Sequence, residues 1–279
     1  MDDISDRLKD ELIKNPEAKL EDLKNLQEWC SSKNFPALKD FELLQFHHSC
    51  LFDMKSTKKC IDAYFRIRRS APELFSNRDV SKEPLKSYIS RVLQCFPLGA
   101  TQEGHQIIMY RLLNPDASQH CFTLDIQLLS LATEVIQHKT GTFPGVTILT
   151  DFDKASIRHM LWAKWGHLRV AMQYLQEGFP SRLESIQTLS STAFVDYALI
   201  AIKPFTNSQV LNKMVYHNIT NLSTLYEKIP KENLPSDYGG LLPSCDEINS
   251  DYMKEVISMK SYFDEKDALH NSSGVKVNK

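Results

Sequence analysis

The sequence predicts an α/β protein in which a small N-terminal helical domain precedes a mostly parallel β-sheet flanked by helices. Three observations predict this fold. Up to about residue 84, charged and apolar residues alternate at helical spacing. From residue 85 onward, short runs that favour β-structure are separated by long amphipathic stretches. One such run, 146–149, follows Pro144-Gly145 and is almost wholly apolar, as expected of a central strand buried on both faces.

The helical spacing in the first domain predicts three or four short helices. Leu20, Leu23 and Leu26 begin the apolar pattern. The chain should break at residues 35–36, 52–53 and 71–72, where proline or aspartate follows an apolar residue, and Asp53 and Ser56 are candidate helix caps. We therefore assign residues 1–84 to an N-terminal helical domain.

The second part of the chain alternates strands with helices. Strands are expected at 107–111, 146–151, 185–189 and 214–217, and amphipathic helices at 122–138 and 156–176. Strands joined through helices form a parallel sheet, because each crossover returns the chain to the same edge. We assign this sheet to residues 85–245, and residues 246–279 to a C-terminal helix and a tail whose end should be disordered.

Composition argues against several classes of function and location. The 279 residues are 42% hydrophobic and 24% charged, with 33 basic against 35 acidic side chains, so a nucleic acid partner is not expected. The acidic N-terminus does not resemble a signal peptide and no apolar run approaches a membrane span, which predicts a cytoplasmic protein. Six cysteines without a Cys-x-x-Cys pair are typical of reduced, packed thiols.

Two groups of residues could carry chemistry. Asp151 and Asp153 follow a buried strand, as the acid pair of a magnesium-dependent phosphoaspartyl phosphotransferase would. Alternatively they accept backbone amides and cap the next helix. The adjacent His47 and His48 would point about 100° apart on a helix and cannot readily share a metal, so we expect them at the surface. Neither these nor any nucleotide, hydrolase or metalloprotease motif supports catalysis, and we predict no enzyme activity, cofactor or metal site.

One segment is unusually poor in charge. Between residues 185 and 202 the only charged side chain is Asp196, and 193–202 wound as a helix would be apolar on nearly every side. A helix of this kind must be buried or must contact lipid. We expect Asp196 to face solvent.

Several motifs in order resemble those of the CRAL-TRIO lipid-transfer proteins. They are Phe41-Glu42-Leu43-Leu44-Gln45-Phe46, the run 146–151, Phe179-Pro180-Ser181-Arg182, Lys203-Pro204-Phe205 and Leu234-Pro235-Ser236-Asp237-Tyr238-Gly239-Gly240. The resemblance is closest to the branch that contains alpha-tocopherol transfer protein and cellular retinaldehyde-binding protein, and it extends from about Leu20 to Gly240.

This resemblance implies a non-enzymatic intracellular carrier. One face of the sheet, with helices, would enclose an apolar pocket for a single hydrophobic lipid, and 193–202 would be a mobile lid helix with Pro204 as its hinge. The lid would exchange the lipid at a membrane surface. Such a protein would be a monomer, cytoplasmic and peripheral at membranes. Two alternatives stay open: an interaction module that kept the fold but lost transfer, and, more remotely, the phosphotransfer enzyme.

The resemblance also implies which side chains line the pocket. They are Ile126, Leu129, Thr133, Val146, Ile148, Thr150, Tyr174, Leu175, Ile186 and Thr188 in the wall, and Phe194, Tyr197, Ala198 and Ile202 in the lid. This set contains hydroxyl groups but no charge, which suits a tocopherol, retinoid, carotenoid or sterol.

A basic surface patch that binds membrane phosphoinositides is implied as well. Arg182, Lys203 and Lys213 are its candidate residues, but Glu184 and Gln209 stand where bases are expected. Because His47 and His48 would gain charge only below about pH 6.5, we expect phosphoinositide binding to be weak and pH-sensitive.

Overall fold

The computed structural model describes residues 5–161, 164–192 and 194–272. Ala193, at the start of the expected lid, and the end of the tail therefore lie outside the described residues. Within those ranges, no helix is both long enough and apolar enough to cross a membrane. The six cysteines all lie within them and are free thiols.

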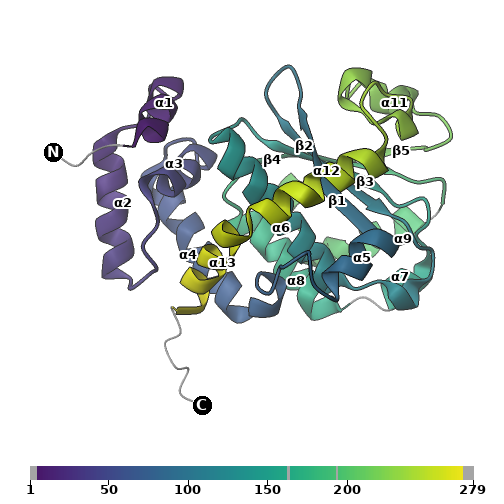
Figure 1. Ribbon diagram of the computed structural model, residues 1–279, viewed down its shortest axis with the longest axis horizontal. Coiled ribbons are helices and arrows are strands. Elements are labelled where there is room, and N and C mark those ends of the chain that lie inside the picture. Colours follow the sequence, from purple (N-terminus) through teal and green to yellow (C-terminus); the bar gives the residue numbers. More distant parts are fainter. Residues whose placement is uncertain (1–4, 162–163, 193, 273–279) are drawn as a thin grey trace, which may run out of the picture.

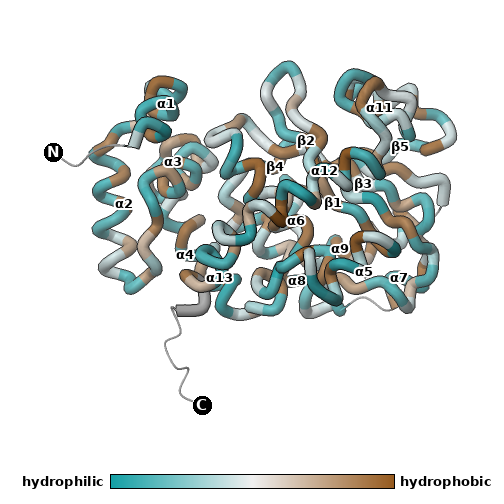
Figure 2. Tube along the Cα trace, in the orientation of Figure 1, coloured by the Kyte–Doolittle hydropathy of each residue, from teal (hydrophilic) through white to brown (hydrophobic). Residues whose placement is uncertain are grey.

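Four helices lie together at one end of the molecule (Figure 1): α1 (Asp6–Lys14), α2 (Leu20–Ser32), α3 (Asp40–Ser49) and α4 (Met54–Ser70). Polar and apolar residues alternate along α1 and α2, as Figure 2 shows. Leu8 of α1 packs with Leu23 and Leu26 of α2 and with Phe65 of α4 in a shared core. The predicted cap is confirmed for Asp53, whose side chain accepts the Ser56 N–H at 2.8 Å. Ser56 is the donor of that bond and not a second cap.

The described residues form one five-stranded sheet in the order β1-β2-β3-β4-β5. The strands are β1 (Leu93–Ala100), β2 (Gln106–Leu112), β3 (Val146–Asp151), β4 (Leu183–Leu189) and β5 (Met214–His217). β1 pairs antiparallel with β2, and all other pairs are parallel, so the mostly parallel sheet is confirmed. β1 was not predicted, because Pro97 and Gly99 disfavour a strand. The structure accommodates them at the sheet edge through a register shift between these two residues.

Helices cover the sheet and connect its strands. They are α5 (Leu85–Arg91), α6 (Phe122–Thr140), α7 (Ile157–Leu161), α8 (Trp165–Gln173), α9 (Phe194–Ile202), α10 (Ser208–Leu211), α11 (Ser223–Tyr226), α12 (Cys245–Ser258) and α13 (Lys260–Ser272). Short 3-10 turns are η1 (Pro72–Leu74), η2 (Ala117–Gln119), η4 (Lys203–Phe205), η5 (Lys231–Asn233) and η6 (Ser236–Tyr238). The single helix expected over 156–176 is instead α7, α8 and a π-helical turn, η3 (Tyr174–Gly178).

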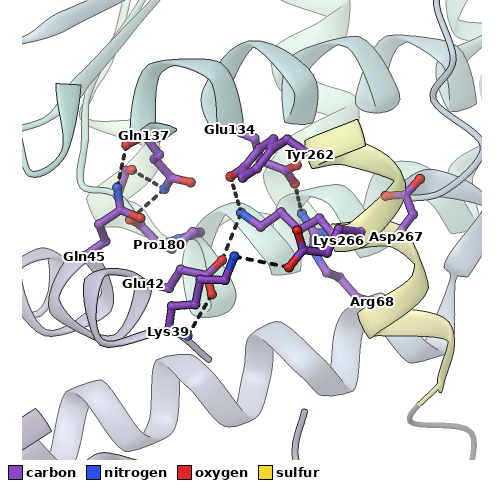
Figure 3. Close-up of polar contacts among 12 residues, drawn as sticks. Lys39, Glu42, Gln45, Arg68, Glu134, Gln137, Pro180, Tyr262, Lys266 and Asp267 are labelled. Carbon is purple, nitrogen blue, oxygen red and sulfur yellow. Dashed lines mark hydrogen bonds and ion pairs between the residues drawn. The ribbon is translucent and has the colours of Figure 1, made fainter. Parts of the chain in front are cut away.

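The C-terminal helices return the chain to its beginning. In Figure 1, α12 crosses the molecule over the sheet and α13 ends beside α4. A buried ion cluster joins these segments to α6 (Figure 3). Glu134 Oε1 accepts hydrogen bonds from Arg68 Nη2 at 2.7 Å and lies 3.0 Å from Arg78 Nη1, and Arg78 Nη2 reaches Asp267 Oδ1 of α13 at 2.5 Å.

Three residues at the centre of this cluster are almost fully buried: Arg68, Arg78 and Glu134 are each 4% exposed or less. Burial alone would raise the pKa of Glu134, but Arg78, Lys266 and Arg68 outweigh it and hold that pKa well below its usual value. Glu134 therefore stays ionised at neutral pH and balances buried cations from three parts of the chain.

We expect Glu134→Gln to lower the free energy of unfolding by about 3–5 kcal/mol, because it leaves buried arginines without their counter-charge. Urea denaturation at pH 7 measures this. The matched control is Glu177→Gln, which breaks the half-exposed Arg66–Glu177 pair (2.8 Å) and should cost less than about 1 kcal/mol. Equal losses in the two variants would contradict the central role of Glu134.

Candidate functional site

An interior cavity of about 200 Å³ lies between α6, α8, η3, the end of α4 and one face of the sheet. Its lining residues are Tyr64, Arg68, Phe75, Tyr110, Phe122, Asp125, Ile126, Leu129, Ser130, Thr133, Glu134, Gln137, Ile148, Thr150, Phe152, Leu168, Ala171, Met172, Tyr174, Leu175, Phe179, Pro180 and Ile186. Most are aromatic or aliphatic, as is typical of a small-molecule site.

Helix α6 supplies one whole side of this cavity. Its lining residues recur at steps of three and four from Phe122 to Gln137, so they form a single stripe along the helix. The fifteen residue steps from Phe122 to Gln137 rise about 22 Å, so this wall of the cavity is long. The opposite stripe, which includes Leu128 and Leu131, packs into the core against the sheet. Helix α6 is thus buried on two sides.

The sheet supplies the facing wall. Ile148 and Thr150 alternate along β3 and so share a face, and Ile148 pairs in register with Ile186 of β4. Tyr174 and Leu175 enter from the π-helical turn η3. A π-helical turn widens a helix locally and turns side chains that an α-helix would direct elsewhere.

The structure brings eight of the predicted pocket residues to the cavity wall. They are Ile126, Leu129, Thr133, Ile148, Thr150, Tyr174, Leu175 and Ile186. Val146, at the start of β3, is fully buried in the core. It lies two residues before Ile148, the first residue of β3 that lines the cavity. Thr188 is buried beside the wall, where its hydroxyl oxygen accepts a 2.9 Å hydrogen bond from Thr150.

The four predicted lid residues lie outside the cavity lining: Phe194, Tyr197, Ala198 and Ile202, all on α9. Phe194 is buried and meets Phe152 with ring centroids 5.7 Å apart, so the Phe152 ring stands between α9 and the cavity. Ala198 is partly buried against the core, and Tyr197 is 52% exposed. Asp196 is exposed, as predicted.

Gln176 of η3 ties down the far end of this helix. Its side-chain amide donates to the Phe205 carbonyl at 2.9 Å, and its oxygen accepts the Asn207 N–H at 2.7 Å. Pro204 lies between α9 and these two bonds, within the turn η4. The end of α9 is therefore fastened to the turn that also forms cavity wall.

The expectation that the pocket contains no charge was wrong. Arg68, Asp125 and Glu134 all line it. Asp125 Oδ1 accepts from the Tyr88 hydroxyl at 2.6 Å, and His120 Nε2 lies 2.7 Å from its other oxygen, so this carboxylate is already partnered. Sequence reasoning missed these residues because charge in an amphipathic helix is ordinarily read as the solvent face. The three- and four-residue steps from Ile126 and Leu129 would have led to Ser130 and Glu134.

A second hollow, the basic groove, has a volume of about 930 Å³ and lies between the helical domain and the β4–α10 region. Its basic lining residues are Lys33, Lys58, Lys59, Arg66, Arg182 and Lys213, and its acidic ones are Asp62 and Glu177. Leu175 and Phe179 line both hollows, so the cavity and the basic groove share a wall. Arg182 and Lys213, two of the three residues predicted for the basic patch, both line this groove. The third, Lys203, is exposed and lies outside the groove lining.

A family model for the CRAL/TRIO domain matches residues 91–240, which is more than half of the chain. The protein belongs to the CRAL/TRIO domain family. A second model, described as a Pinta-like UBA domain, matches residues 15–85.

The chain is similar to named members at low identity over most of its length. It is 26% identical to human alpha-tocopherol transfer protein-like over 257 residues, covering 88% of this chain and 72% of the relative. It is 23% identical to rat clavesin-1 over 278 residues, covering 97% and 76%. The crystal structure of Sfh5 superposes with a TM-score of 0.49 and 14% identity, covering 80% of this chain and 81% of Sfh5.

In this CRAL/TRIO protein, the predicted surface position of the adjacent histidines was wrong for His47. His47 is fully buried, and its Nδ1 lies 2.8 Å from the Thr57 hydroxyl. Burial lowers its pKa, and burial together with Arg182 and Lys14 lowers the pKa of His48 to about 4. His48 is therefore neutral between pH 7.5 and 5.5 and cannot make phosphoinositide binding pH-sensitive in this range.

Asp151 and Asp153, the candidate catalytic acids, both accept hydrogen bonds from neighbouring parts of the chain. Asp151 Oδ1 accepts the Asp153 N–H at 3.0 Å and its Oδ2 accepts the Tyr238 hydroxyl at 2.6 Å. Asp153 Oδ1 accepts the Ser191 N–H at 2.9 Å. These bonds fit the structural alternative, although the amides belong to Asp153 and Ser191 and not to the next helix.

Proposed function

We propose that this protein is a non-enzymatic carrier that holds one hydrophobic small molecule in the α6 cavity and exchanges it at membranes. The observation that carries this proposal is the long, mainly apolar interior cavity beside a helix whose apolar side chains face solvent. Membership of the CRAL/TRIO family and similarity to a protein named alpha-tocopherol transfer protein-like support it. A cytoplasmic location, peripheral at membranes, and the domain limits 1–84, 85–245 and 246–279 belong to the same proposal.

Loading requires the cavity to widen. Its volume of about 200 Å³ is below the roughly 300–1,000 Å³ of small-molecule sites. Helix α9 is the element we expect to move, because it rests on the cavity through the ring of Phe152 and is fastened at its far end by Gln176. In the widened state, Phe194, Tyr197, Ala198 and Ile202 would reach the ligand.

The exposed side chains of α7, α8 and α9 form what we call the apolar rim. They are Ile157 (47% exposed), Leu161 (77%), Trp165 (42%), Tyr197 (52%) and Ile200 (70%). Helix α7 contacts α9, and both lie at the end of the molecule away from the N-terminal helices (Figure 1). Large apolar side chains gathered in this way are suited to insertion at a bilayer interface. We propose that the rim contacts the membrane during exchange.

A second candidate function is an interaction module that has kept the fold but lost transfer. The small volume of the cavity favours it: bulky side chains such as Tyr174, Phe152 and Phe179 line the cavity, and only about 200 Å³ is left between them and the other wall residues. Such a protein would take up no lipid. Measurement of lipid uptake by the wild-type protein distinguishes the two functions.

We expect Ala171→Trp to abolish lipid uptake, because the indole would fill the cavity from α8. Delipidated protein would be incubated with mixed lipid vesicles, re-purified and examined by native mass spectrometry and solvent extraction. The control is Arg169→Trp, on the exposed side of the same helix, which should take up lipid like the wild type. Absence of any lipid from the wild type would favour the interaction module.

We expect Ile200→Asp to slow lipid transfer between vesicles about tenfold while leaving uptake unchanged, since inserting an apolar side chain of this size contributes about 1.5–3 kcal/mol. A fluorescent transfer assay measures the rate. Ile13→Asp changes an equally exposed isoleucine (78%) on α1 and serves as the control. Equal slowing by both variants would mean that the rim has no special part in exchange.

We propose that the basic groove binds anionic lipid headgroups, phosphoinositides included, and we expect Lys59→Glu to weaken binding to phosphoinositide vesicles. Lys24→Glu, an exposed change on α2 outside the groove, should not. Because the pKa of His48 is lowered to about 4, the histidine is neutral at both pH 5.5 and pH 7.5, and vesicle affinity should not rise on acidification. A several-fold rise at pH 5.5 that His48→Gln removes would contradict this.

A further inference from the structure

We propose that Arg68 binds the head group of the carried molecule, and that this molecule is a single-chain lipid with a carboxylate head. The proposal rests on the carrier function and adds the chemical class of its ligand. It is carried by one buried guanidinium at the cavity wall whose hydrogen-bonding capacity is only partly used.

Arg68 is 4% exposed, lines the cavity, and makes few of the hydrogen bonds that it can donate. Its Nη2 donates to Glu134 Oε1 at 2.7 Å and stands 3.5 Å from the Tyr174 hydroxyl. Within the described part of the chain, its Nε and Nη1 have no hydrogen-bond partner. Leaving buried donors of a charged group unpaired is costly, and an acceptor brought by a ligand would remove that cost.

The rings of three aromatic residues surround this guanidinium. Their centroids lie 4.5 Å (Tyr64), 4.8 Å (Phe75) and 5.7 Å (Tyr174) from Arg68 Cζ, and all three side chains also line the cavity. The rings hold the cation in place and exclude water from it. In such a low-dielectric setting an anionic acceptor is bound more strongly than in water, and more strongly than a neutral one.

The charges around the site leave room for an anion. Lys266 of α13 joins Arg68 and Arg78 as the third cation near Glu134, and Figure 3 shows Lys266 and Arg68 beside Glu134. The other acids of the cluster are partly exposed: the side chain of Asp267 is 18% exposed and that of Glu42 is 19% exposed. Water therefore screens part of their charge. Asp267 pairs with Arg78 and Glu42 with Lys266, whereas within the described residues the carboxylate that pairs with Arg68, Glu134, is shared with Arg78. Arg68 is therefore the cation at which a carboxylate brought by a ligand fits.

The opposite end of the cavity does not compete for such a head group. Asp125 lies there, nine residues before Glu134 and about 13 Å away along α6. Its two oxygens already meet the Tyr88 hydroxyl and His120 Nε2, and neither partner lines the cavity, so this pair presents no donor to a carboxylate head. Between the two ends, Ile126 and Leu129 provide apolar wall. The ligand therefore places its head at Arg68 and its chain along α6 toward Asp125.

The test compares three probes of equal chain length at pH 7.5: tetradecanoic acid, tetradecan-1-ol and methyl tetradecanoate. Each is titrated into delipidated full-length protein by displacement of an uncharged fluorescent probe. We expect the acid to bind at least about tenfold more tightly than the alcohol and the ester, the effect of a charge-assisted hydrogen bond. Arg68→Met should bring the three affinities together, mainly by weakening the acid. Arg69→Met, which changes the exposed arginine next to Arg68 on α4 and lies outside the lining of both hollows, should leave the preference intact.

Two results would overturn the proposal: equal affinities of wild type for acid and alcohol, or an acid preference that survives Arg68→Met. If Arg68→Met does not fold, the wild-type ratio still decides, and Tyr174→Phe, which removes the hydroxyl beside the guanidinium, should reduce the acid preference without reducing affinity for the alcohol. Wild type that binds none of the probes and takes up no lipid would refute the carrier function itself. Wild type that binds the alcohol as well as the acid would refute only the head-group assignment.

Discussion

The buried carboxylate of Glu134 is the interaction on which the architecture depends. It faces Arg68 at the end of α4, Arg78 in the connection before α5, and Lys266 on α13, so one side chain of α6 holds three segments that are distant in sequence (Figure 3). A buried charge of either sign cannot lose its partners cheaply, because little water replaces them. The helical domain, the sheet and the C-terminal helices are therefore held by one electrostatic balance as well as by apolar contact.

The same balance sets the polarity of the cavity. Helix α6 is buried on two sides: one stripe packs on the sheet, while the other carries Glu134 among apolar residues and forms cavity wall. Arg68 must approach that stripe to pair with Glu134, and it thereby becomes a wall residue itself. A cavity built in this way cannot be lined by hydrocarbon alone. Its fold requires a cation at one end.

The features that could be predicted from the sequence are those set by the local periodicity of apolar residues. The apolar run of β3 and the three-to-four residue steps of α6 follow from periodicity, and three predicted α6 residues do line the cavity. Strand β1 could not be predicted, because Pro97 and Gly99 oppose a strand locally, and pairing with β2 and packing against α6 and α12 stabilise it. Arg68 was not predicted as a wall residue and His47 was misjudged for a related reason: their burial comes from tertiary partners, Glu134 and Thr57, that no local pattern reveals.

The apolar segment that ends at Ile202 is held in a way that links the two hollows. Tyr174 and Leu175 of η3 form cavity wall, and the next residue, Gln176, lines the basic groove and fastens Phe205 and Asn207 beyond α9. A π-helical turn is less favourable than an α-helical one, so its geometry can change at small cost. On the proposed function, a molecule that displaced Tyr174 or Leu175 would act on the end of α9 through Gln176, and an anionic surface in the groove would act on the same residue from the other side.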